Sequence, residues 1–189
     1  MCHSPAMIRP ADPARDAAAC AAIYAPYVID SAASFEEEPP DAAEFARRIG
    51  ELSRSHAFLV DERDGRLAGY AYAGPHRTRA AYRWAADVSV YVDASFHRRG
   101  VGRGLYEPLL ALLRERGFRV ACAGITLPNP GSVGLHEALG FEQVGVYRGI
   151  GWKAGAWRDV GWWQLGLAPR EDGARPEPPA PGGLSASPR

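Results

Sequence analysis

The stretch "YVDASFHRRGVGRGLYEPLLALLRERGF", residues 91–118, places three glycines within five positions, directly after a run of basic residues. Upstream, "WAADVSVYVDA" (84–94) alternates in polarity and predicts a strand. Downstream, an apolar stripe predicts an amphipathic helix over 102–116, bent in its first part by Pro108. The stripe consists of Leu105, Leu109, Leu112 and Leu113. The glycines therefore lie where a strand passes into a helix.

Such a junction has the geometry of an anion site. Backbone N–H groups converge at a helix N-terminus, its dipole favours negative charge, and glycine lets a ligand approach closely. A P-loop would end in Gly-Lys-Ser/Thr, which is absent here. A dinucleotide fingerprint would read G-x-G-x-x-G with an acidic residue about 20 positions later, whereas this chain reads G-x-G-x-G. Two interpretations remain open: a loop that binds the pyrophosphate of an acyl-CoA, and a glycine-rich helix start that binds no ligand.

The length, composition and charge of the chain exclude several classes of function. The 189 residues suit one domain, and 47% are apolar, which is enough for a core. Basic and acidic residues number 22 each, so charge indicates no nucleic-acid partner. The three cysteines are scattered, without metal or disulfide spacing. No run could span a membrane and no signal-peptide core begins the chain, so we expect a cytoplasmic protein with no metal and no membrane partner.

The remaining pattern predicts an α/β protein with the element order β-α-α-β-β-β-α-β-α-β-β. Its first helix begins at Asp12 and is interrupted near Pro26, and Asp41 caps the second. Residues 1–6 form a flexible leader, and 168–189 form a Pro/Gly-rich tail with little to bury, which we expect to be disordered. The folded domain is therefore expected over 7–167.

A second motif lies downstream. "LPNPGSVGLHEALGF" (127–141) follows another predicted strand and has the spacing N-x6-H-x3-GF. Together with "HRRGVG" (97–102), it resembles the GNAT superfamily of N-acetyltransferases. "YAGPHRTRAAYRW" (72–84), "VSVYV" (88–92) and "GWKAGAWRDVGWWQL" (151–165) are similar to the phosphinothricin and methionine sulfoximine/sulfone acetyltransferases within it. The resemblance covers about 7–167, with the motifs in the right order.

This resemblance implies a GNAT fold, a mixed and mostly antiparallel sheet that is splayed at its central strands, with helices on both faces. A β-bulge in the strand before the glycines would open a slot for acetyl-CoA, and an amide of that strand would support the oxyanion. His97 stands where the family has Gln or Arg, so a backbone contact is expected there. The cofactor-binding residues implied are Val90, Tyr91, Val92, Arg98, Arg99, Gly100, Val101, Gly102, Arg103, Asn129 and Ser132.

Two residues carry the implied catalysis. His136 stands where many members have the Tyr that protonates the thiolate, and a structural helix histidine is the alternative. Asp87 stands where the phosphinothricin enzymes have a Glu that takes the amine proton. Because Asp is one methylene shorter, a bridging water is expected, and binding of the substrate ammonium is the alternative. His76 lies on the loop expected over the substrate and stays open as a further site residue.

The substrate side rests on the same resemblance. Arg77 and Arg79 could clamp a carboxylate, although two loop arginines also suit a solvated surface. The full set of implied substrate-binding residues is Phe35, Glu36, Arg77, Thr78, Arg79, Asp87, Val88 and Ser89. A dense group of late tryptophans indicates core or the interface of a homodimer. The expected reaction is acetylation of the α-amine of a small amino acid analogue, and the alternatives are another amine, a peptide N-terminus or a non-catalytic acyl-CoA sensor.

Overall fold

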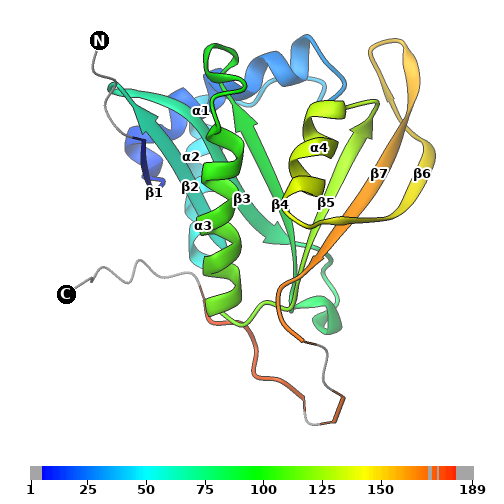
Figure 1. The fold of residues 1–189 in the computed structure, drawn as a ribbon. Coiled ribbons are helices and arrows are strands. Elements are labelled where there is room, and N and C mark those ends of the chain that lie inside the picture. The colour runs from blue at the N-terminus through cyan, green and yellow to red at the C-terminus, as the bar shows by residue number, and fades with distance from the viewer. Residues whose placement is uncertain (1–5, 170–171, 174, 182–189) are drawn as a thin grey trace.

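The computed structural model describes residues 6–169, 172–173 and 175–181. A seven-stranded mixed sheet runs through it in the order β1-β2-β3-β4-β5-β7-β6 (Figure 1). The strands are β1 (Met7–Pro10), β2 (Ala57–Arg63), β3 (Arg66–Pro75), β4 (Ala85–Val92), β5 (Val120–Leu127), β6 (Glu142–Lys153) and β7 (Ala156–Gly166). The helices are α1 (Pro13–Ile29), α2 (Ala42–Ser55), α3 (Val101–Glu115) and α4 (Pro130–Ala138), with short 3₁₀ turns η1 (Ala80–Tyr82) and η2 (Ala94–Phe96). This order confirms the one that the sequence predicts.

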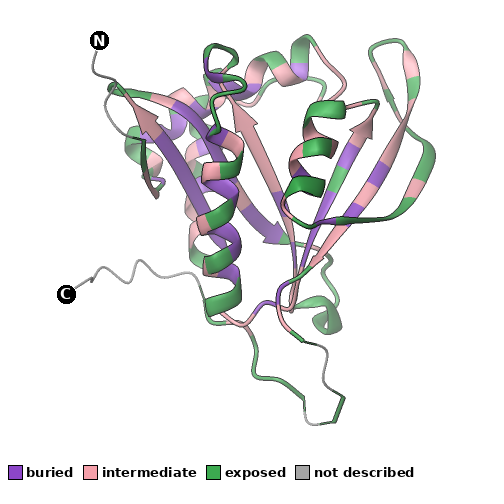
Figure 2. Cartoon of the chain, in the orientation of Figure 1, coloured by how far each residue is buried: buried purple, intermediate pink, exposed green. Residues whose placement is uncertain are grey.

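Helices cover both faces of the sheet, as expected. Alternate side chains of a strand point to opposite faces, so Val60 of β2 joins a core with α1 and α2, whereas Leu59 joins a core with α3. Figure 1 shows α3 and α4 on one face, and α1 and α2 on the other. Burial concentrates in β2, β3 and the inner side of α3, and much of the β6–β7 hairpin is exposed (Figure 2).

The central strands β4 and β5 pair only briefly. They are parallel, and their register runs from Ala85↔Val120 to Asp87↔Cys122, after which they diverge (Figure 1). The other strand pairs are antiparallel. The β-bulge expected in β4 is wrong, because β4 pairs with β3 without a register shift from Gly69↔Val92 to Pro75↔Ala86. The splay needs no extra residue in β4, since β5 leaves the ladder instead.

The interruption expected near Pro26 is also wrong. Helix α1 continues through Pro26 to Ile29: the φ of proline is compatible with a helix, and the lost hydrogen bond and the crowding of the carbonyl four residues earlier fall in the last turn, where they do not end the helix. The predicted cap is confirmed, since Asp41 accepts from the N–H of Glu44 at 2.8 Å. Asp12 caps α1 in the same way and accepts from the N–H of Ala14 at 2.8 Å. These caps satisfy donors that the first turn of a helix leaves open.

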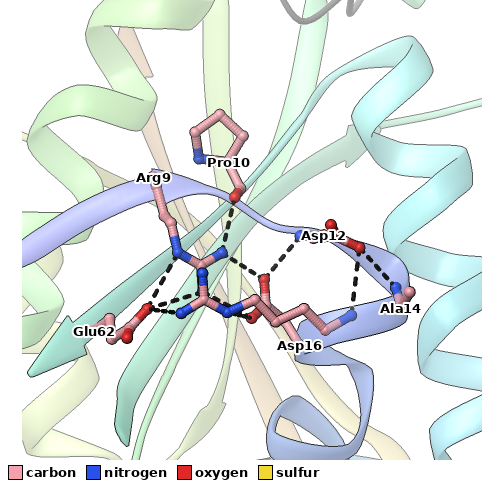
Figure 3. Close-up of polar contacts among 7 residues, drawn as sticks. Arg9, Pro10, Asp12, Ala14, Asp16 and Glu62 are labelled. Atoms are coloured by element: carbon pink, nitrogen blue, oxygen red, sulfur yellow. Dashed lines mark hydrogen bonds and ion pairs between the residues drawn. The ribbon is translucent and has the colours of Figure 1, made fainter. Parts of the chain in front are cut away.

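An ion-pair network fixes β1 and the start of α1 against β2 (Figure 3). The Arg9 guanidinium donates to both oxygens of Asp16, at 2.6 and 2.8 Å, and to Oε2 of Glu62 at 3.1 Å. Asp16 is only 2% exposed and also accepts from the N–H of Asp12 at 2.8 Å. The hydrogen bonds to Asp16 compensate for the cost of burying its charge. The network therefore holds β1, α1 and β2 in a fixed arrangement.

Part of the expected tail lies against the domain. The indole Nε1 of Trp84 donates to the carbonyl of Glu177 at 2.9 Å, and the N–H of Ala180 donates to the carbonyl of Arg116 at 2.8 Å. Residues 1–5 of the leader and 170–171, 174 and 182–189 of the tail lie outside the described residues, and the domain boundaries stay predictions. Among the residues described, no helix combines the length and apolar character that crossing a membrane requires.

Candidate active site

A cavity of about 520 Å³ opens where β4 and β5 part. Its walls are the second half of β4 and the middle of β5, and it is closed by the start of α3 and by α4. Ten of the eleven predicted cofactor residues line it: Val90, Tyr91, Val92, Arg98, Gly100, Val101, Gly102, Arg103, Asn129 and Ser132. His136, Val88 and Ser89 line it as well. The two sequence motifs, separate along the chain, therefore meet around one space.

The edge of β4 that faces this cavity carries backbone groups that do not pair with β3. The Tyr27 hydroxyl donates to the carbonyl of Val92 at 2.7 Å and lies 3.3 Å from its N–H, so these groups point away from β3. In an antiparallel pair alternate residues share an edge, which turns the N–H and carbonyl of Val90 the same way. The register with β5 ends at Asp87. An extended ligand that carries amides could therefore pair with β4 as an added strand.

The glycine turn forms one end of the cavity. Gly100 precedes α3 with φ 77° and no side chain caps this helix, so the N–H groups of its first turn are open. The side chain of Leu135 in α4 lies so close that a Cβ on Gly102 would be 2.9 Å from its Cδ2. Uncapped N–H groups beside Arg98 and Arg103 make a site for an anion.

Arg99, the remaining residue predicted to bind the cofactor, does not line the cavity. Its guanidinium sits 5.7 Å from the ring centroid of Phe96, and its N–H donates to the carbonyl of Phe96 at 3.3 Å. The turn alternates direction here, since Arg98 has φ 59°. As a result, neighbouring arginines point to different sides. Asn129 caps α4 by accepting from the N–H of Ser132 at 3.1 Å, which leaves its amide N–H₂ for a ligand.

His136 is buried and has partners at both ring nitrogens. Nδ1 lies 2.7 Å from the carbonyl of Ser132, to which it can only donate, and 3.4 Å from the Ser132 hydroxyl. Nε2 lies 3.0 Å from the hydroxyl of Tyr106. Because Nδ1 carries the proton, Nε2 of the neutral ring accepts from Tyr106. Burial lowers the pKa of His136 and raises that of Tyr106, so the neutral pair is favoured.

Asp87 lies at the last residue of β4 that pairs with β5. Its Oδ1 is 2.6 Å from Nδ1 of His76, on the loop after β3. Burial raises the pKa of Asp87, against the lowering effect of His76. The thiol of Cys122 belongs to the same group, and its pKa is raised to about 11 by burial and by Asp87. One ligand-type atom from each of the three lies within 4.8 Å of the others.

The other predicted substrate residues are spread around this group. The guanidinium of Arg77 lies 5.8 Å from the ring centroid of Trp162. Thr78 and Arg79 are exposed, and together with His76 and Arg77 they line a separate groove beside Pro178 and Pro179, not the cavity. Phe35 packs against Gly151 so closely that a Cβ there has no room. Glu36 accepts from Arg48 at 2.7 Å and from the Tyr24 hydroxyl at 2.9 Å, so its carboxylate already has partners.

Three side chains at the site have no role assigned from the sequence: Tyr27, His76 and Tyr106. Their contacts join residues 65, 11 and 30 positions apart, so no local motif contains both partners. Tyr106 follows Leu105 on the apolar side of α3, and a buried tyrosine needs a partner for its hydroxyl. That requirement is the signal from which a sequence reading could have found Tyr106.

The fold and the site define a class: a splayed sheet with a cavity between its parting strands and an uncapped helix start at a glycine turn. A family model of the acetyltransferase (GNAT) domain matches residues 10–162, and the chain belongs to this family. It is 41% identical to a phosphinothricin N-acetyltransferase of Streptomyces viridochromogenes, over 94% of this chain and 93% of that protein. It is 34% identical to an L-methionine sulfoximine/L-methionine sulfone acetyltransferase of Salmonella typhimurium, over 85% and 94%.

A solved structure agrees with this fold over most of its length. A phosphinothricin acetyltransferase of Sinorhizobium meliloti, in complex with AcCoA, superposes with a TM-score of 0.82 at 35% identity. The match covers 86% of this chain and 88% of that one. The GNAT fold expected from the sequence is therefore confirmed.

Proposed function

We propose that this protein transfers the acetyl group of acetyl-CoA to the α-amino group of a small amino acid analogue, of the phosphinothricin and methionine sulfoximine type. The observation that carries the proposal is the cavity between β4 and β5, which has an anion site at one end and begins at Val88, directly after Asp87, where the two strands part. The named activities of the relatives give the substrate class. The amine attacks the thioester directly, without an acyl-enzyme.

The residues around the cavity fit coenzyme A. Arg98, Arg103 and the open N–H groups of α3 would hold the diphosphate. The pantetheine amides would pair with Val90, and the amide of Asn129 remains free to donate to a carbonyl. The mouth near His97 is polar, since Nε2 of His97 lies 3.1 Å from the carbonyl of Val92. Each of these groups offers what a diphosphate or an amide needs, so binding is expected without rearrangement of the fold.

The group near which the amine loses its proton and the group toward which the thiolate leaves lie on opposite faces of the sheet. Val88 joins the core with α3, so Asp87, the adjacent residue in the strand, points to the other face. His136 and Tyr106 belong to α4 and α3. An amine arriving from the Asp87 side would lose its proton there, and the thiolate would leave toward His136. The N–H of Val90 is the candidate oxyanion donor between them.

An anionic group on the substrate would find two donors near Asp87. Nε1 of Trp162 is buried and has no hydrogen-bond partner among the described residues. Arg77 lies over the same indole ring. A buried donor without a partner indicates an acceptor that a ligand supplies, and a carboxylate beside the α-amine is the natural candidate. Thr78 and Arg79 would act only from the rim.

The assembly proposed is a homodimer. Exposed apolar side chains gather on the β6–β7 hairpin, where Trp152 and Trp157 pack at 5.5 Å and are 59% and 67% exposed. An apolar surface of this kind marks an interface. We expect the protein in the cytoplasm, because Cys20 and Cys122 are free thiols.

A turnover panel tests the function. Acetyl-CoA consumption would be followed with phosphinothricin, methionine sulfoximine and methionine sulfone, each with and without its α-carboxylate. Free amino acids, a polyamine and a peptide N-terminus serve as comparison amines. We expect turnover of the first group, and loss of most of that turnover when the carboxylate is removed. Tight CoA binding with no turnover on any amine would instead identify a sensor.

A further inference from the structure

We propose that His76 is the base that takes the proton from the substrate amine, and that Asp87 acts by positioning His76. The proposal rests on the proposed acetyl transfer and names the residue that performs one of its steps. It replaces the expectation that a water bridges Asp87 to the amine. The geometry of the loop after β3 carries it, since this loop brings an imidazole directly onto the Asp87 carboxylate.

The contact between the two side chains is short and directional. Nδ1 of His76 and Oδ1 of Asp87 are 2.6 Å apart, which is a charge-assisted hydrogen bond. An ionised carboxylate can only accept, so Nδ1 carries the proton and the lone pair of the neutral ring is at Nε2. Nε2 has no protein partner within the described part of the chain. The free basic atom of the pair is therefore Nε2.

Neighbouring rings fix the orientation of this imidazole. Tyr82 of η1 and Trp162 of β7 meet the ring edge to face, with centroids 5.7 and 5.9 Å away. The His76 side chain is 17% exposed, and the Asp87 side chain is 34% exposed. A histidine held by a carboxylate on one nitrogen and by rings on its sides has one orientation, as a base in catalysis requires.

The charged and titratable groups around His76 favour this role. Asp87 on β4 stabilises the imidazolium that forms when the proton arrives, and Arg77 is the nearby cation on the same loop. The thiol of Cys122 on β5 has a pKa of about 11, so it stays protonated and does not compete. The hydroxyl of Tyr82 belongs to the ring that packs against His76. Among these kinds of side chain, histidine is the one that ordinarily exchanges a proton between about pH 5 and 8.

The proton balance is complete without another reactant. The substrate ammonium gives one proton to Nε2 of His76, and the neutral amine then forms a bond to the thioester carbon. The tetrahedral adduct loses the second amine proton as the C–S bond breaks and the thiolate leaves, taking up one proton. His76 returns its proton to solvent. The sum is ammonium plus acetyl-CoA giving amide, CoA thiol and one released proton.

Kinetics of two single variants separate His76 from Asp87 as the base. We expect His76→Gln to lower kcat by about 100-fold, with the KM for acetyl-CoA nearly unchanged, and to lose the acid limb of the pH profile of kcat/KM. Asp87→Asn should keep an acid limb and move it to lower pH, because the imidazolium loses its anionic partner. A His76→Gln enzyme with near-normal kcat and an intact acid limb would overturn the proposal, as would an Asp87→Asn enzyme with no acid limb.

A double variant tests whether the length of the side chain at position 87 decides if its carboxylate can contact the amine. In a His76→Ala background, Asp87→Glu lengthens the carboxylate by one methylene, and we expect it to restore at least roughly a tenth of the lost kcat. No recovery would contradict the idea that His76 places a base where the short Asp87 carboxylate cannot contact the amine. His56→Gln is the matched control, because His56 lines the same groove as His76 but contacts Ser55 at 2.9 Å instead of Asp87. Its kcat and acid limb should equal those of the wild type.

Two further measurements test the contact between His76 and Asp87 itself and the possibility that it belongs to a metal site. A downfield proton signal from Nδ1 of His76, present in the wild type and absent in Asp87→Asn, tests the contact without any turnover. If no panel amine is acetylated, the proposed function fails, yet this signal still tests the contact. Loss of activity with a chelator and its return with Zn²⁺ would show that His76, Asp87 and Cys122 hold a metal, and would overturn the base assignment.

Discussion

At the scale of single residues, the two histidines of the site differ in what their second nitrogen does. His136 has both nitrogens occupied by Ser132 and Tyr106, whereas Nε2 of His76 is free of protein partners among the residues described. A ring with two partners is held in place and exchanges protons only through them. His136 therefore acts together with Tyr106. Whether His136 donates a proton to the thiolate or has only a structural role is tested by changing both members of this pair.

We expect His136→Phe to lower kcat by about 100-fold, while the dissociation constant of CoA changes little. The change also leaves the buried Tyr106 hydroxyl without its partner, which costs about 1–3 kcal/mol of stability. Tyr106→Phe is the matched variant, and kcat and urea unfolding would be measured for both and for the double variant. Strongly non-additive losses in kcat identify a functional pair. Unchanged kcat in both single variants would make His136 purely structural.

At the scale of elements, the sequence predicts what local pattern determines. Periodicity and caps indicate the order of strands and helices, and the glycine turn and the α4 motif indicate the lining of the cavity. The errors at Pro26 and in β4 arise because a proline near the end of a helix is compatible with helical φ, and because β5 can leave the ladder without a bulge. The pairing of His76 with Asp87 depends on the register Gly74↔Asp87, which a single sequence does not reveal.

The contact between α3 and α4 gives a prediction at Gly102. A methyl group there would meet Leu135 at 2.9 Å and push that side chain toward the cavity. We therefore expect Gly102→Ala to raise the KM for acetyl-CoA about tenfold, which corresponds to about 1.4 kcal/mol. Gly100→Ala is the comparison: it has open space but φ 77°, so it should cost about 1 kcal/mol of stability. A Gly102→Ala enzyme with a wild-type KM would show that Leu135 moves elsewhere.

The network of β1, α1 and β2 predicts a pH dependence of stability. Burial is the largest single influence and would raise the pKa of Asp16, but the hydrogen bonds from Arg9 and from the N–H of Asp12, with the charges of Arg9 and Arg15, together lower the pKa. Such a group contributes stability above its unfolded pKa of about 4, and the contribution is lost as pH falls through the folded value. We expect Arg9→Met to cost about 3 kcal/mol at pH 7, the low end for a broken buried pair.

Urea unfolding at pH 7 and at about pH 3.5 checks this prediction. The difference in the free energy of unfolding between wild type and Arg9→Met should be smaller at the lower pH. Arg47→Met is the control, because Arg47 pairs with Glu44 on the exposed face of α2 and should affect stability little at either pH. A gap that stays constant between the two pH values would mean that packing of the Arg9 side chain, and not its charge, stabilises these elements.

At the scale of the whole molecule, the β6–β7 hairpin stands apart from the rest of the surface. Strand β6 is the last strand of the sheet order, and it carries Val144, Tyr147, Ile150 and Trp152 with about half or more of each exposed. Trp157 of β7 adds the largest exposed ring, at 67%. The hairpin also reaches the substrate side, since Lys153 donates to the carbonyl of Glu36 and Gly151 packs on Phe35. A partner here would therefore stabilise the loop beside the site.

We expect the wild type to be a dimer in light scattering after gel filtration, and Trp157→Glu combined with Ile150→Glu to be a monomer with an unchanged circular dichroism spectrum. Two charges placed in an apolar interface of ordinary size, about 800 Å² per partner, remain desolvated and unpaired, which outweighs the contacts. Met7→Glu is the matched control, because Met7 is 49% exposed on β1, at the opposite end of the sheet order from β6. A monomeric wild type, or a control that also dissociates, would place the interface elsewhere. Since Phe35 packs on the hairpin, the monomer should also bind its amine substrate more weakly.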